Sequence, residues 1–148
     1  MNYQIDQSIK IEDTRKATFV CLSNSKEVVI EIPAKDKRYL KLFFRKLRKP
    51  LIFKLFTFAV LCFRAIKELS PSKVQIDKEY LGNEELIKTF IIQILTLEKI
   101  KIPQIEFFRV GKASFAHIKA YGAYKKRKYD IQISSSEVLR LYDAIDKK

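Results

Sequence analysis

Residues 72–88, SKVQIDKEYLGNEELIK, deliver an aspartate to the end of a predicted β-strand. Val74 and Ile76 alternate with polar residues, as in a half-buried strand, and Asp77 follows directly. A carboxylate at a strand tip is suited to holding a divalent cation, but it is equally suited to accepting hydrogen bonds from backbone amides. Glu79 is either an acid beside such a site or a surface residue, and we favour the surface. Asp77 is therefore the candidate metal ligand of this segment.

The only histidine of the chain, His117, shares a predicted helix with two tyrosines. Steps of four and three place His117, Tyr121 and Tyr124 on one helical face, which Lys125 continues. Rings beside a cation are suited to stacking on a nucleic acid and contacting its phosphates, although a half-exposed helix has the same composition. Just before this helix, Lys112 lies at a strand-to-helix junction whose backbone amides form a candidate phosphate site.

A strongly basic helix is predicted over residues 35–49. Six of the twelve residues from 38 to 49 are Lys or Arg, in a chain whose net charge is +13. The cations that line its polar face at steps of three and four are Arg38, Lys41, Arg45 and Arg48. This excess favours a polyanionic partner, and we prefer nucleic acid (DNA, RNA or a hybrid). An anionic membrane surface and solubility alone are the rival explanations.

Several features indicate a cytoplasmic protein without a transmembrane segment. Cys21 and Cys62 lie in apolar surroundings and lack the spacing of a zinc site. The N-terminal residues are too polar for a signal peptide. The most apolar stretch, residues 51–66, is short for a bilayer span and contains Lys54 and Arg64.

The elements that would position these residues alternate between strands and helices. Two local signals mark helix boundaries. Pro50 separates two helices, and Ser134 to Glu137 has the spacing of a capping box that opens the last helix. Strands are predicted at 3–11, 17–23, 27–32, 73–77 and 104–110, with a short candidate at 129–133; helices are predicted at 35–49, 51–68, 83–98, 113–126 and after 134. We therefore expect one α/β domain spanning residues 1–148. Its mixed five-stranded sheet would comprise a three-strand antiparallel meander and parallel strands, flanked by helices.

The order βββαβαβα, followed by one more helix, resembles the ribonuclease H-like superfamily, which includes ribonucleases H, retroviral integrases, transposases and junction resolvases. Short segments are similar too. Ile5-Asp6-Gln7-Ser8 resembles the Asp-x-Ser of the family's first strand, and Ile76-Asp77-Lys78-Glu79-Tyr80 resembles the Asp-Ser-x-Tyr of its fourth.

The resemblance implies a metal-dependent phosphodiester hydrolase. In that fold the first and fourth strands are neighbours, so Asp6 and Asp77 would hold two Mg²⁺ or Mn²⁺ ions. The resemblance implies that His117 would either ligate metal or assist product release. The family also places a glutamate inside its first long helix. Here the corresponding helices offer Asp36 at the start and Glu68 at the far end. The alternative is therefore a non-catalytic nucleic-acid-binding module on the same fold.

Overall fold

The computed structural model describes residues 3–109 and 115–147, which build one mixed sheet flanked by helices. Its six strands lie in the order β5-β4-β1-β2-β3-β6. They are β1 (Tyr3–Ser8), β2 (Thr18–Ser23), β3 (Glu27–Ile32), β4 (Lys73–Asp77), β5 (Gln104–Phe108) and β6 (Ile131–Gln132). The predicted α/β class with a mixed sheet is confirmed.

The prediction of a five-stranded sheet is wrong, because the short candidate strand at 129–133 forms as β6 and adds a sixth strand beside β3. Two residues, Ile131 and Gln132, pair parallel with Ile30 and Glu31. Backbone hydrogen bonds from Asp130 and Ile133 flank this pairing. A two-residue strand is too short to produce a recognisable alternation of polar and apolar residues, so sequence periodicity gives it little weight.

The strand pairing divides the sheet into two halves. β1, β2 and β3 form an antiparallel meander, and residues 24–26 make the tight connection between β2 and β3. β4 pairs parallel with both β1 and β5. The expectation that the first and fourth strands are neighbours is therefore met. Whether the chain is a ribonuclease H-like protein stays a prediction.

Five helices accompany the sheet in the described part of the chain. They are α1 (Ala34–Lys46), α2 (Pro50–Leu69), α3 (Glu84–Leu97), α4 (Phe115–Lys126) and α5 (Ser135–Asp146). Pro50 occupies the first turn of α2, where its missing N–H leaves no hydrogen bond unmade. The predicted cap of the last helix is confirmed, since Ser134 Oγ accepts a hydrogen bond from the Glu137 amide. None of the helices among the described residues combines the length and apolar character that crossing a bilayer requires.

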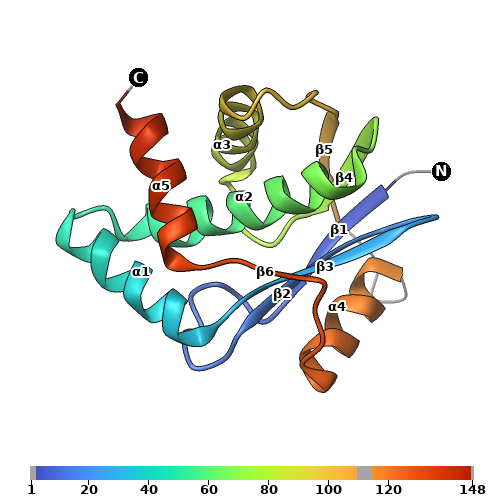
Figure 1. Ribbon diagram of the computed structural model, residues 1–148, viewed down its shortest axis with the longest axis horizontal. Helices are drawn as coiled ribbons and strands as arrows, with labels where there is room; N and C mark the ends of the chain where they lie inside the picture. Colours follow the sequence, from blue (N-terminus) through green and yellow to red (C-terminus); the bar gives the residue numbers. More distant parts are fainter. Residues whose placement is uncertain (1–2, 110–114, 148) are drawn as a thin grey trace.

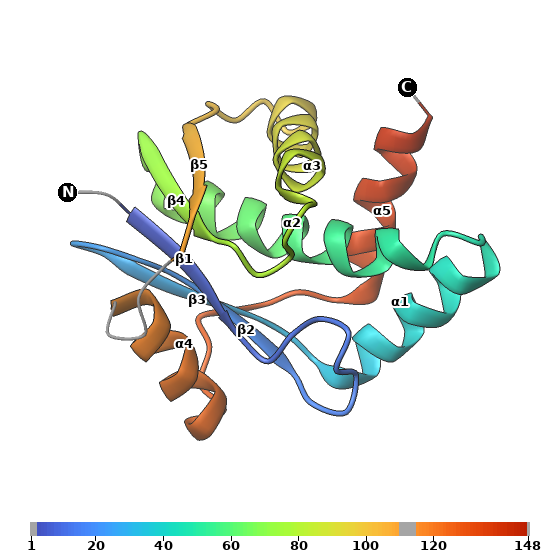
Figure 2. The ribbon, with the colours of Figure 1, turned by 180° about the vertical axis from the view of Figure 1, so that it is seen from behind.

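The helices form a layer on each side of the sheet. Figures 1 and 2 show α4 on one face, while α2 crosses the other face with α3 and α5 beside it. The main core lies between α2 and the sheet. On the opposite face, Ala120 and Ala123 of α4 pack on Phe19, Cys21 and Val29. These two small side chains let α4 lie close to the strands, because no long side chain separates them.

A fully buried lysine fixes the loop between β1 and β2. Lys37 of α1 is 0% exposed, and its Nζ donates hydrogen bonds to the carbonyl oxygen of Asp13 (2.6 Å), to Thr18 Oγ1 (2.9 Å) and to the carbonyl oxygen of Lys10 (3.3 Å). Burial lowers the pKa of Lys37 to about 8. Because each acceptor lies in or beside the loop, this one side chain ties residues 10–18 to the helix.

Replacing Lys37 by Ala is expected to destabilise the fold by about 3 kcal/mol, because it leaves buried acceptors without a donor and opens a cavity. Urea unfolding followed by circular dichroism measures this. Lys35→Ala, at an exposed position of the same helix, should change the free energy of unfolding by less than about 0.5 kcal/mol. Equal effects for the two variants would show that the buried hydrogen bonds contribute nothing.

Candidate metal centre

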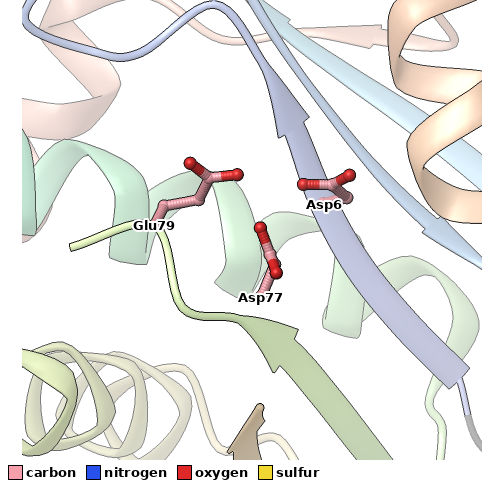
Figure 3. A group of neighbouring side chains, drawn as sticks. All are labelled: Asp6, Asp77 and Glu79. Atoms are coloured by element: carbon pink, nitrogen blue, oxygen red, sulfur yellow. The ribbon is translucent and has the colours of Figure 1, made fainter. Parts of the chain in front are cut away.

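Three carboxylates gather at the carboxyl ends of the neighbouring strands β1 and β4. Asp6, Asp77 and Glu79 each offer an oxygen atom, and these atoms lie within 4.8 Å of one another. Figure 3 shows the three side chains directed toward a common space, Asp6 from β1, Asp77 from the tip of β4 and Glu79 from the segment beyond it. The two predicted metal ligands are therefore brought together, and a third acid joins them.

The register of the parallel pair explains the meeting of Asp6 and Asp77. Ile5 is opposite Ile76, and both side chains belong to the main core. Successive residues of a strand point to opposite faces. The next residue of each strand, Asp6 and Asp77, therefore faces away from that core, toward the side of the sheet that α4 covers. Burial of the isoleucines fixes this register.

Glu79 corrects the sequence prediction, which favoured a surface role for it. After β4 the chain turns, with the Glu79 amide donating to the Asp77 carbonyl oxygen at 2.8 Å. This turn returns the half-buried Glu79 side chain to the acidic group. A spacing of two residues after Asp77 was the available signal, but a spacing cannot reveal a turn that follows a strand end.

His117 contacts the most deeply buried of the three acids. Its Nδ1 lies 2.6 Å from Asp6 Oδ2, and Asp6 is 1% exposed. The Gln7 amide donates to the other oxygen of Asp6, Oδ1, at 2.8 Å. These two contacts fix the orientation of the Asp6 carboxylate. The close packing of α4 on β2 and β3 brings His117 within reach of β1.

Burial and the repulsion between carboxylates make Asp6 and Glu79 hold protons more tightly than ordinary carboxylates do. Burial raises the pKa of Glu79 to about 8, and its hydrogen bonds to Asp77 and Asp6 contribute in the same direction. Burial also raises the pKa of Asp6, with an opposing contribution from His117 and a further rise from the charge of Asp77. At neutral pH a proton on Glu79 therefore relieves the repulsion, and a bound cation would replace it.

The donor set fits a hard divalent cation. Mg²⁺ takes oxygen ligands at about 2.0–2.1 Å, which places pairs of ligand atoms roughly 3–4 Å apart. The oxygens of Asp6, Asp77 and Glu79 are close to this spacing, so small side-chain rotations would bring them onto one ion. Mn²⁺ shares this preference for carboxylate and water.

Four further acids have different contacts. Asp36 accepts a hydrogen bond from the Ser135 amide, Glu68 and Glu137 pair with Arg64, and Asp130 Oδ2 accepts from the Val29 amide. Within residues 3–109 and 115–147, none of them belongs to the group formed by Asp6, Asp77 and Glu79. The ribonuclease H-like resemblance implies a glutamate inside the first long helix. No residue of α1 or α2 belongs to the acidic group, and Glu79 supplies the third carboxylate instead.

The residues predicted to bind nucleic acid divide between two helices. Arg38, Lys41, Arg45 and Arg48 are exposed on α1 or just after it. Tyr121, Tyr124 and Lys125 lie in the second half of α4, which also contains His117. Lys125 Nζ is 5.6 Å from the centroid of the Tyr121 ring, and the rings of Tyr121 and Tyr124 are 6.4 Å apart. Lys112 lies outside the described residues.

No protein-family model, curated protein or solved structure matches this chain. The ribonuclease H-like resemblance and the activity that it implies are accordingly proposals, which depend on the chain's own residues.

Without a divalent cation, Glu79 should make the fold less stable as the pH rises. Its pKa is about 8 in the folded chain against an ordinary 4.5, so its stabilising contribution is complete below about pH 4.5 and is lost as the pH rises through 8. Glu79→Gln removes this dependence. In EDTA, the melting temperature of the Gln variant should decline less between pH 5 and 7.5 than that of the native chain. Parallel declines would contradict the assignment.

Proposed function

We propose that this protein is a cytoplasmic, Mg²⁺- or Mn²⁺-dependent nuclease of ribonuclease H-like type. The observation that carries the proposal is the convergence of Asp6, Asp77 and Glu79 at the ends of two adjacent parallel strands. A net charge of +13 supports a polyanionic substrate. Two buried, free cysteines are in keeping with a reducing compartment.

Each residue of the centre has a distinct part in the proposed reaction. Asp6, Asp77 and Glu79 would hold the cations, and bound cations supply an activated water and charge stabilisation at the leaving oxygen. Asp6 is held in one orientation by the Gln7 amide and by His117. Glu79 must lose its proton before it ligates a cation, because a protonated carboxyl is a poor ligand.

The face bearing α4 is the side from which we expect the nucleic acid to approach. His117 on this helix contacts Asp6, and Tyr121 and Lys125 follow on its exposed surface. Stacking on a tyrosine ring suits single-stranded segments, whose bases are free to leave the helical stack. The cations of α1 belong to a different side of the fold, next to α2 and α5 (Figure 1), and would contact a longer substrate.

A non-catalytic nucleic-acid-binding module is the second candidate, and the contact of His117 with Asp6 favours it. His117 Nδ1, 2.6 Å from Asp6 Oδ2, gives this carboxylate a hydrogen-bonding partner that requires no metal ion. In that case Glu79, whose pKa is raised by burial, would keep its proton and its hydrogen bond to Asp77. Such a module would bind nucleic acid with strong salt dependence and leave it intact.

Asp77→Asn should abolish divalent-cation-dependent cleavage while preserving the fold. A neutral amide in place of one ligand is expected to reduce the rate by at least about a hundredfold. The assay follows labelled single-stranded RNA, an RNA–DNA hybrid and branched DNA in Mn²⁺, Mg²⁺ or EDTA. Glu85→Gln, an exposed acid in the first turn of α3, is the matched control and should retain full activity.

Cation binding has a readout that does not require finding the right substrate. Saturating Mn²⁺ should raise the melting temperature of the native chain by several degrees, since a ligand at a hundred times its Kd stabilises by about 2.7 kcal/mol. Asp77→Asn should lose this increase. If Mn²⁺ leaves the melting temperature of the native chain unchanged and the chain still binds nucleic acid, the result would support the non-catalytic module.

Single substitutions on α4 should separate stacking from charge in nucleic-acid binding. Tyr121→Ala should weaken binding of a single strand by about 1–3 kcal/mol at any salt concentration. Lys125→Ala should reduce the slope of log K against log salt by about 0.7. Fluorescence anisotropy from low to physiological salt measures both, with Lys147→Ala as the control. Binding that is indifferent to salt would refute both candidate functions.

A further inference from the structure

A cavity of about 380 Å³ lies apart from the acidic group, where the last turn of α4 approaches the loop between β1 and β2 and the end of β3. Its volume is within the range of sites that take small organic ligands. None of Asp6, Asp77, Glu79 or His117 lines it. What it would bind therefore follows from a separate set of side chains.

One wall of the cavity is aromatic. Phe19 and Tyr124 meet edge to face, with ring centroids 6.5 Å apart. Phe19 is 1% exposed, whereas Tyr124 is only partly buried. Lys16 Nζ lies 5.6 Å from the Tyr124 ring centroid. A fixed aromatic ring beside a cation suits a flat heterocycle, which stacks on the ring while the cation contacts its anionic part.

A carboxylate and a carboxamide also line the cavity and are joined to one another. Gln132 Nε2 donates to Glu31 Oε1 at 2.6 Å, a contact fixed by the pairing of these residues across β3 and β6. Glu31 is 8% exposed. This hydrogen bond leaves Glu31 with a second oxygen and Gln132 with its amide oxygen, both of which are acceptors. The pair therefore offers acceptors to a ligand that presents neighbouring N–H donors.

The rim of the cavity is cationic. Arg15, Lys16 and Arg127 line it, and the negative charges beside them are Glu31 in the lining and Asp13, which pairs with Arg15. Arg15 is held by Asp13, with contacts of 3.0 and 3.2 Å. The guanidinium groups of Arg15 and Arg127 match the geometry of phosphate oxygens. An apolar ligand or a cation would leave this positive charge unbalanced.

We propose that this cavity binds a nucleotide and prefers guanine. The base stacks on Tyr124, and its adjacent N1–H and N2–H donors face the acceptors of Glu31 and Gln132. The phosphate contacts Arg15, Lys16 and Arg127. Adenine presents an acceptor where guanine presents N1–H, so the carboxylate disfavours it. This binding does not depend on nuclease activity, because the two sites share no side chain.

The two sites nevertheless lie on one helix. Tyr124 follows His117 by seven residues, which is about 10 Å along α4. A nucleotide in the cavity is therefore close enough to belong to the same strand as a phosphodiester at the acidic group. In that setting the cavity would select a guanine at a fixed distance from the bond that reacts.

Isothermal titration calorimetry of the full chain in EDTA tests the proposal without any cleavage. GMP should bind saturably, AMP at least tenfold more weakly, and ribose 5-phosphate and inorganic phosphate more weakly again. Equal affinity for GMP and inorganic phosphate would overturn the base site, since only the cationic rim would then be acting. A dissociation constant of about 10 mM corresponds to a binding free energy of only about 3 kcal/mol. Absence of saturable GMP binding up to that concentration would overturn the proposal entirely.

Three variants assign the effects to side chains. Glu31→Gln retains the shape of the cavity and should weaken GMP at least tenfold while leaving AMP unchanged. Arg127→Ala alters an exposed residue and should weaken GMP and inorganic phosphate together. Tyr124→Phe should retain GMP binding, whereas Tyr124→Ala should reduce the affinity for GMP at least tenfold. Circular dichroism checks that both variants are folded. Tyr39→Ala, an exposed tyrosine of α1, is the control. GMP affinity unchanged in both Glu31→Gln and Tyr124→Ala would refute the assignment.

Discussion

The parallel pairing of β1 with β4 is the constraint on which the candidate centre depends. These strands are far apart in the sequence, and only their register places Asp6 beside Asp77. Three carboxylates at this distance repel one another, so the chain must hold them together by other means. Ile5, Val74 and Ile76, fully buried on the opposite face of the same strands, provide that restraint. A slip of one residue would expose the isoleucines and bury the acids among them.

The second constraint is the close packing of α4 on the meander of β1, β2 and β3. Alanines of α4 face the strands, at positions where larger side chains would hold the helix farther from the sheet. The short distance between α4 and the sheet lets His117 contact Asp6. The same seating brings Tyr124 against Phe19 at the other end of the helix. A single packing choice thus serves both the acidic group and the cavity near the last turn. Displacing α4 would disturb the two sites together, even though they share no residue.

Local signals predicted much of the fold and part of the centre. The alternation before Asp77, the proline between α1 and α2 and the Ser134 cap depend on neighbouring residues, so sequence alone reveals them. The meeting of Glu79 with Asp6, the place of β6 beside β3 and the burial of Lys37 depend on contacts between distant segments. In the sequence, Lys37 does not differ from the other cations of a basic helix. Only the fold shows that the loop between β1 and β2 encloses it.

A basic protein with a concentrated acidic group faces opposing electrostatic demands. Its net charge attracts a polyanion, but a phosphodiester that reached Asp6, Asp77 and Glu79 would meet three carboxylates. A proton on Glu79 removes only one of these charges, whereas a divalent cation reverses the local sign. In the proposed enzyme, cation and nucleic acid therefore bind the centre more tightly together than apart, and linkage requires each to raise the affinity of the other by the same factor. A non-catalytic module has no such requirement, because its nucleic acid need never approach the carboxylates.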